Sequence, residues 1–383
     1  MKRGLVKAAF LGLLIFAFLP PAAASSLVKV CPPVGIQARG AAFEPGGIIL
    51  TAFDRDSLWV YHVNADRRYP LPDTNPCGTN CHLSPDARWI TYVNAFDQSY
   101  AKMRLDGTER TPLVTYAADV EWWSADTLLV WTPGRSAYLQ PESGGERAYL
   151  DVQGVVAVQP GGYWAVLIRQ DGDVFRRGLI DLEKRGLAGI AQPYLDLGED
   201  VPYFDAASWS PDGSWLAYVA PGADDPQVGI AGGEIFGVRP SDGTRVQWTD
   251  LNADYGAVRI NGRASGELSW SPDGTRIAFW VIELLEANPE GKTGSAMIHI
   301  LDITTGSVQA YCGFTTDEHT PNPPRLIWSP DGTHLALGGN VPGDDKGYLL
   351  LALDTATGIF TELSNGIYPT LGGPNPVAWG LAP

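Results

Sequence analysis

Trp209-Ser210-Pro211-Asp212-Gly213, followed by the apolar run 214–219, is the most informative segment of the sequence for its fold. The same five residue types return at 270–274 and 328–332, each time before another strand-like run. Proline presets the first corner of a tight turn, aspartate bonds the local backbone, and glycine accepts the left-handed conformation. Each copy is therefore predicted to be a β-hairpin corner, made by Pro211, Asp212, Gly213, Pro272, Asp273, Gly274, Pro330, Asp331 and Gly332.

Weaker copies of this corner extend the series toward the amino terminus, at residues 43–47, 83–87, 123–126 and 158–162. A later alternating strand that ends in a polar turn follows most corners, so the repeating unit has four strands. Such units are typical of a β-propeller, because one small sheet cannot bury both faces alone. A β-sandwich would have turns as often but would not repeat the same pentapeptide. We predict an all-β chain of seven four-stranded blades, with six or eight as alternatives.

The carboxyl-terminal segment and the tryptophans fit this architecture. Residues 376–380 read as one extra inner strand, which we expect to seal the ring beside the first blade. Trp209, Trp270 and Trp328 occupy equivalent repeat positions, and this equivalence indicates packing between blades rather than a ligand site.

The Ser-Pro-Asp-Gly turn, preceded by Trp and followed by an Ile/Leu-Ala-aromatic strand, resembles the WD40-like (PD40) repeat of TolB-type propellers. The match is close at 207–220, 268–281 and 326–339 and looser at 81–93. Unlike TolB, this sequence has no α/β domain ahead of the repeats, so the lipoprotein-partner role is not carried over. The same repeat forms the gating propeller of prolyl oligopeptidase-like proteins, but no hydrolase domain follows here. The resemblance implies a fold and not an activity.

The amino terminus predicts export. Lys2, Arg3 and Lys7 precede the apolar stretch 8–19, and small residues follow at 22–25, as in a secretory signal peptide. The apolar stretch is shorter than the roughly 20 residues that span a bilayer, so a retained anchor is the lesser alternative. We expect a signal peptide at 1–24, one propeller domain at 25–383, and a soluble secreted or periplasmic monomer with no membrane span after cleavage.

Four cysteines in an exported chain indicate disulfides. We expect Cys77 to pair with Cys81, stapling the loop before the second corner, and Cys31 to pair with Cys312. From sequence alone, four cysteines allow three disulfide connectivities, and buried free thiols are the alternative to disulfides. We expect no metal and no cofactor, because the cysteines lack the spacing of zinc knuckles and His82 is the sole nearby imidazole.

The charge is strongly acidic. Without Lys2, Arg3 and Lys7 the chain keeps 24 basic residues against 43 acidic ones, a formal balance of −19. Such a surface repels nucleic acid and anionic lipid and favours cations, basic partners or solubility alone.

The long connections are predicted to gather on one face of the ring. In a four-stranded blade, the first-to-second and third-to-fourth turns share one face, here the short-turn face. The second-to-third and blade-to-blade connections share the other, here the long-loop face, with long segments at 193–206, 221–233, 252–266, 283–294, 313–325, 340–347 and 365–376. Exposed loops on a rigid scaffold often bind partners, although neutral drift also lengthens loops. The predicted binding residues are Asp224, Asp225, Asp254, Glu283, Asp317, Glu318, His319, Asp344 and Asp345.

Catalytic signatures are absent from the sequence. There is no Gly-x-Ser-x-Gly elbow, no His-Glu-x-x-His and no Gly-x-Gly-x-x-Gly. The sequence therefore favours a non-enzymatic platform that binds an envelope or extracellular protein, peptide or glycan. The alternative is a propeller hydrolase or lyase that uses paired carboxylates at the central channel. A mainly structural repeat domain of the envelope is a third option.

Overall fold

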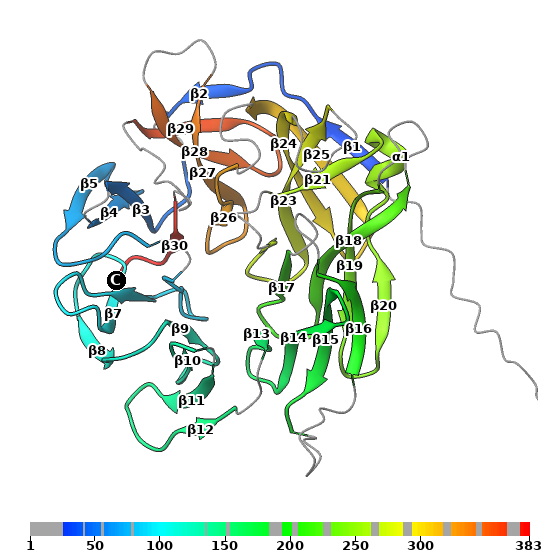
Figure 1. Ribbon diagram of the computed structural model, residues 1–383. Coiled ribbons are helices and arrows are strands. Elements are labelled where there is room, and N and C mark those ends of the chain that lie inside the picture. Colours follow the sequence, from blue (N-terminus) through cyan, green and yellow to red (C-terminus); the bar gives the residue numbers. More distant parts are fainter. Residues whose placement is uncertain are drawn as a thin grey trace, which may run out of the picture.

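Seven small sheets follow one another around a central axis in the computed structural model (Figure 1). The structure describes residues 26–40, 43–54, 57–77, 80–134, 136–150, 154–183, 194–200, 206–224, 231–261, 268–285, 293–316, 323–341, 347–365 and 376–383. Along this part of the chain the sheets run in sequence order around the ring, so each is one blade of a β-propeller. The predicted all-β fold with seven blades is confirmed.

The blades are built as follows. Blade 1 contains β3 (Ile48–Asp54), β4 (Ser57–His62) and β5 (Arg67–Leu71), and blade 2 contains β6 (Trp89–Val93), β7 (Tyr100–Arg104) and β8 (Thr111–Val114). Blade 3 contains β9 (Asp119–Trp122), β10 (Thr127–Trp131), β11 (Ala137–Pro141) and β12 (Ala148–Tyr149). Blade 4 contains β13 (Val155–Val158), β14 (Trp164–Asp171), β15 (Val174–Asp181) and β16 (Tyr194–Glu199).

The later blades have longer strands. Blade 5 contains β17 (Ala207–Trp209), β18 (Leu216–Asp224), β19 (Ala231–Arg239) and β20 (Thr244–Gln247). Blade 6 contains β21 (Val258–Ile260), β22 (Ser269–Trp270), β23 (Arg276–Leu284), β24 (Thr293–Asp302) and β25 (Ser307–Thr316). Blade 7 contains β26 (Ile327–Trp328), β27 (His334–Asn340), β28 (Tyr348–Asp354) and β29 (Phe360–Asn365).

Both ends of the chain complete the ring. The carboxyl-terminal strand β30 (Ala378–Gly380) pairs antiparallel with β3, Trp379 opposite Ile49, and supplies the innermost strand of blade 1. In Figure 1 this strand returns beside the first blade, so the predicted seal is confirmed. In blade 2 the inner position is reduced to a bridge between Leu83 and Ile90.

The amino-terminal segment straps two blades from outside. β1 (Ser26–Val30) adds in parallel to β25, and β2 (Ile36–Ala38) adds in parallel to β29. Between them, Cys31 forms a disulfide with Cys312 of β25, and a second disulfide joins Cys77 to Cys81. Both expected pairings are confirmed. The strap covers the outer edges of blades 6 and 7, which would otherwise be open to pairing.

The Ser-Pro-Asp-Gly corner has the same hydrogen-bond pattern in blades 5, 6 and 7. In blade 6, Ser271 Oγ donates to Asp273 Oδ1 over 2.5 Å, and the same oxygen accepts from Thr275 N. Ser271 Oγ in turn accepts from Arg276 N at the start of β23. Gly274 has a φ of +68°. Local chemistry therefore forms each corner, and blades 5 and 7 repeat it at Asp212 and Asp331.

The hydrophobic core is divided among the blade interfaces. Among the described residues, seven clusters of buried apolar side chains lie at the interfaces between blades, one cluster at each. The interface that closes the ring, between blades 7 and 1, contains Ile49, Leu350 and Trp379, all fully buried. Trp122, Trp270 and Trp328 also join neighbours, because each indole N–H donates to a backbone carbonyl of the preceding blade. The tryptophans therefore pack between blades, as their equivalent positions indicated.

Parts of the expected long connections are regular structure. The range 252–266 contains most of the short helix α1 (Leu251–Tyr255) and all of β21, and 193–206 contains β16. The ends of β18 and β19 also shorten the loop expected at 221–233. The loop assignment was wrong at these places, because tertiary pairing orders segments whose local sequence is rich in acidic and turn residues. Within the described residues, no helix is long and apolar enough to cross a membrane.

Candidate functional site

The structure describes only part of the predicted acidic surface. The side chains of Asp254, on α1, and Glu283, on β23, are exposed, and Asp224 ends β18. The other predicted residues, Asp225, Asp317, Glu318, His319, Asp344 and Asp345, lie outside the described residues.

The two described carboxylates belong to neighbouring elements of the long-loop face. Glu283 pairs in register with Val258 of β21, and β21 follows directly after the helix that carries Asp254. The structure therefore places these two carboxylates on one stretch of rim, between blades 5 and 6.

Helix α1 is held at its amino-terminal end by a buried carboxylate. Glu234 of β19 is 1% exposed, and its oxygens accept hydrogen bonds from Thr249 Oγ1, Leu251 N and Asn252 N over 2.6–2.9 Å. Burial raises the pKa of Glu234, and these hydrogen bonds lower it, with a raised pKa as the net result. The bonds satisfy donors that a helix otherwise leaves open.

The other end of α1 is held by a buried histidine. Tyr255, the last residue of the helix, lies with its hydroxyl 2.9 Å from His299 Nε2, and His299 Nδ1 lies 3.0 Å from the carbonyl oxygen of Met297. Because that carbonyl can only accept, Nδ1 carries the proton and Nε2 accepts from Tyr255. Burial lowers the pKa of His299 to about 4, so the ring is neutral at pH 7. Asp254 is thus displayed by a helix fixed at both ends.

A cavity of about 890 Å³ runs along the axis of the ring. Its wall includes the inner-strand tryptophans and, toward the long-loop face, Asn261 and Arg325. Toward the short-turn face it includes the corner prolines Pro85, Pro211 and Pro330. The wall combines indole, proline and aliphatic surface with polar side chains, as in many small-molecule pockets.

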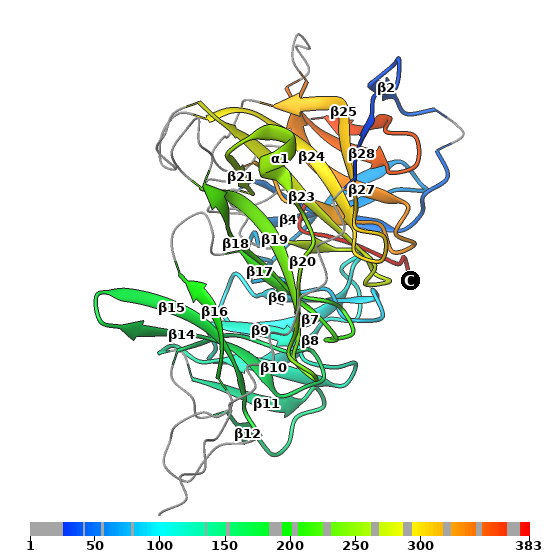
Figure 2. The same ribbon diagram turned by 90° about the vertical axis from the view of Figure 1, so that its right-hand side faces the viewer.

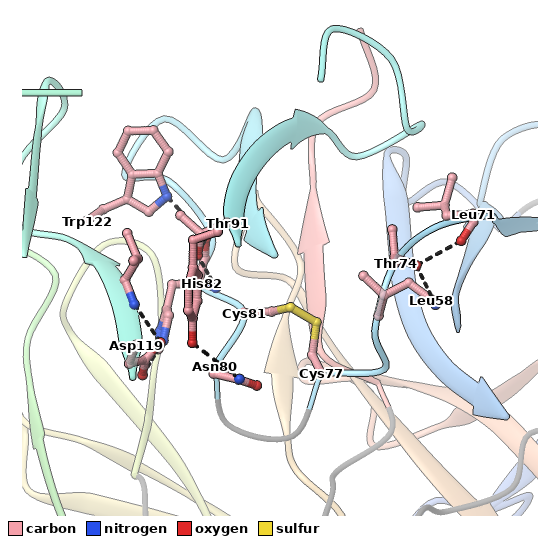
Figure 3. The surroundings of a disulfide bond; sticks show 12 residues. Leu58, Leu71, Thr74, Cys77, Asn80, Cys81, His82, Thr91, Asp119 and Trp122 are labelled. Atoms are coloured by element: carbon pink, nitrogen blue, oxygen red, sulfur yellow. Dashed lines mark hydrogen bonds and ion pairs between the residues drawn. A yellow bond between two sulfur atoms is a disulfide. The ribbon is translucent and has the colours of Figure 1, made fainter. Parts of the chain in front are cut away.

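The polar groups of this wall include His82 and Glu121, which form a cluster with Asp119 beside the cavity. His82 lies at the inner edge of blade 2, while Asp119 and Glu121 alternate along β9 of blade 3. One ligand atom from each residue lies within 4.8 Å of those of the other two. Figure 3 shows His82 Nε2 directed at the Asp119 carboxylate, 3.0 Å from both oxygens, beside the Cys77–Cys81 disulfide.

The cluster changes the electrostatics of its surroundings. The Tyr100 hydroxyl, which donates to the Ala118 carbonyl oxygen over 2.8 Å, has its pKa raised to about 12. Burial is the main cause, and the negative charges of Asp119 and Glu121 add to it against a hydrogen bond from Asn80. The tyrosine therefore stays protonated.

Other carboxylates that line the cavity are engaged in corners. Asp86 Oδ1 accepts from Ser84 Oγ over 2.6 Å, and Asp331 Oδ1 accepts from Ser329 Oγ over the same distance. Burial raises the pKa of Asp331, but the bonds from Ser329 and Thr333 outweigh burial and the net pKa is lowered. These two acids are turn residues, so the cluster at β9 is where described channel carboxylates meet.

Comparisons with known proteins find similar architecture at low identity. TolB from Acinetobacter baumannii is 16% identical with a TM-score of 0.43, over 88% of this chain and 67% of that chain. Hydrazine synthase from Kuenenia stuttgartiensis is 12% identical with a TM-score of 0.44, over 87% of this chain and 99% of that chain. No family model and no curated protein matches the sequence. The blade count therefore stands on the strand pairing of this chain itself.

Proposed function

We propose that this chain is an exported, non-enzymatic recognition propeller. It binds an envelope or extracellular protein, peptide or glycan through its long-loop face and works as a monomer. The observation that carries the proposal is the asymmetry between the two faces of the ring.

The asymmetry is visible in the strand ends of blades 5 and 6. Blade 4 reverses it, because β14 ends at Asp171 and β15 begins at Val174, whereas β15 ends at Asp181 and β16 begins at Tyr194. β18 ends at Asp224 and β19 begins at Ala231, and β23 ends at Leu284 while β24 begins at Thr293. On the short-turn face, by contrast, β24 ends at Asp302 and β25 begins at Ser307. In the side view, the β14–β15 hairpin also projects from the ring (Figure 2).

Strand register follows the same asymmetry. Eight register shifts occur in the described sheets, and each lies at the middle of its strand or nearer the long-loop end. Bulges re-aim side chains and are frequent beside functional sites. Regular corners therefore hold the ring on one side, and irregular, acidic strand ends shape the other.

Export is supported by the cysteine chemistry. Both disulfides need an oxidising compartment to persist, and the first 24 residues read as a signal peptide. An acidic exported surface attracts basic partners and repels nucleic acid.

Loop grafting tests the proposal. In one variant, Asn-Gly replaces residues 225–230 and 342–346. In a matched control, Gly-Ser residues lengthen the 303–306 turn on the short-turn face. Both variants are checked for unchanged cooperative unfolding and then used for affinity capture from the native envelope. The proposal expects the grafted variant to lose partners that the wild type and the control both retain. Equal capture by all three proteins would reject it.

A second candidate function is hydrolase or lyase chemistry at the channel. The observation that favours it is the meeting of Asp119 and Glu121 beside His82, since paired carboxylates can serve as general acid and base. Turnover of a glycoside, polyuronate or ester substrate by the wild type, lost in Glu121→Gln and retained in His62→Asn, would establish it. No turnover across such a panel rejects it and leaves the binding proposal intact.

A further inference from the structure

We propose that His82, Asp119 and Glu121 form a binding site for a divalent transition-metal ion, with Zn²⁺ as the best match. His82 and Glu121 line the axial cavity, and the site lies apart from the long-loop residues of the proposed function. It does not depend on that function.

The chemistry of the three ligand side chains indicates which ion is expected. Imidazole nitrogen and carboxylate oxygen are both established zinc ligands, and an imidazole disfavours Ca²⁺ and Mg²⁺, which prefer all-oxygen sites. Three protein ligands leave a coordination position for water or a small ligand. Among the described residues, this is the one cluster of three or more such side chains.

Strand geometry brings the donors together. Asp119 and Glu121 are two residues apart on β9, and alternate residues of a strand point to the same side. His82 reaches them from the neighbouring blade, where its Nε2 lies 3.0 Å from both Asp119 oxygens. An ion bound between His82, Asp119 and Glu121 would contact all three side chains. It would displace the proton that His82 and Asp119 share.

Further hydrogen bonds orient each ligand. Asp119 Oδ1 accepts from the backbone N–H of Val120 over 2.8 Å, and Glu121 Oε1 accepts from Trp131 Nε1 over 2.5 Å. The outer partners of metal ligands are expected to fix ligand orientation in this way.

Hydrogen bonds also fix the backbone of His82. Its carbonyl oxygen accepts from Trp122 Nε1 over 3.1 Å, and its N–H donates to Thr91 Oγ1 over 3.0 Å. The Cys77–Cys81 disulfide ends directly before His82 (Figure 3).

The cluster is accessible to an ion from solvent. His82 and Glu121 line the cavity of about 890 Å³, and the side chains of His82 and Asp119 are 21% and 24% exposed. The strongly acidic chain also raises the local concentration of cations.

Calorimetric titration of the untagged, EDTA-treated protein with ZnCl₂ tests the site, with MnCl₂ and CaCl₂ as parallel titrants. The variants are His82→Asn, Asp119→Asn and Glu121→Gln, and the last keeps an acceptor oxygen for Trp131. His62→Asn, on β4 and away from the cluster, is the matched control. Equal unfolding midpoints establish that each variant folds.

The expected result is one Zn²⁺ per chain, about 10-fold or more weaker binding in each cluster variant, and no change in His62→Asn. Quenching of tryptophan fluorescence by Co²⁺, lost in the cluster variants, would place the ion near Trp122 and Trp131. The proposal is overturned if the wild type binds no Zn²⁺, if Ca²⁺ binds more tightly than Zn²⁺, or if Zn²⁺ binding survives in all three cluster variants.

Discussion

The two disulfides should differ strongly in what they contribute to stability. Cys31 and Cys312 are separated by 281 residues, whereas Cys77 and Cys81 are separated by 4. Because a cross-link lowers the entropy of the unfolded chain more for a longer loop, the loop-entropy relation gives about 5.6 kcal/mol for the first and about 2 kcal/mol for the second. We therefore expect removal of the long-range disulfide to cost about 4 kcal/mol more.

Equilibrium urea unfolding, followed by tryptophan fluorescence, measures the difference. The paired variants are Cys31→Ala with Cys312→Ala, and Cys77→Ala with Cys81→Ala, both compared with the oxidised wild type. The amino-terminal strap should also lose hydrogen-exchange protection at 26–30 in the first variant alone. Equal losses of unfolding free energy, or a larger loss in the second variant, would show that loop length does not set the contribution of each disulfide.

Three further predictions concern single residues. Ala87→Gly should raise the unfolding free energy by about 1 kcal/mol, because Ala87 has a φ of +56° at a corner where other blades have glycine, and an unchanged or lower value would contradict this. Glu234→Gln should lower the unfolding free energy by about 2 kcal/mol in the same assay, because the amide has one acceptor oxygen where the carboxylate has two. A loss below about 0.5 kcal/mol would contradict the role of Glu234 as the cap of helix α1. The lowered pKa of His299 contributes stability above about pH 6.5 that is lost as pH falls toward 4, by about 3 kcal/mol, because only the unfolded chain takes up the proton. His299→Phe should flatten that part of the urea-derived stability profile, and an unchanged slope would contradict the assignment.

The hairpin corners and the closure of the ring by the carboxyl-terminal strand could be predicted from sequence, because the signals for both are local. Asp273 and Gly274 form their turn with neighbours along the chain, and the corners of blades 5 and 7 repeat this chemistry. The segment 376–380 lacked a partner strand in its own unit, so it had to complete another blade. The packing of the tryptophans between blades could be predicted from their equivalent positions in the repeats alone.

Helix α1 could not be read in this way, because its cause is tertiary. Asp250, at the helix start, makes no side-chain cap. The cap comes from Glu234 of β19, and Tyr255 is fixed by His299 of the next blade. A local reading of an acidic segment between strands therefore predicts a loop.

The cluster of His82, Asp119 and Glu121 could not be predicted from sequence for a related reason. The alternation of Asp119 and Glu121 is visible in the sequence, but their partner His82 belongs to another blade. His82 precedes Ser84 by two residues, whereas Glu121 precedes Ser124 by three. Because successive strand residues point to opposite faces, aligning the blades by their corners does not set the imidazole level with the carboxylates.

The most direct test of recognition by the long-loop face is hydrogen–deuterium exchange of the propeller alone and saturated with a partner recovered by envelope capture. We expect the partner to slow exchange at strand ends of the long-loop face, residues 219–224, 281–285 and 338–341. We expect no change at the corners, residues 210–214, 271–275 and 329–333. Protection of the corners with none at the long-loop strand ends would contradict recognition by the long-loop face.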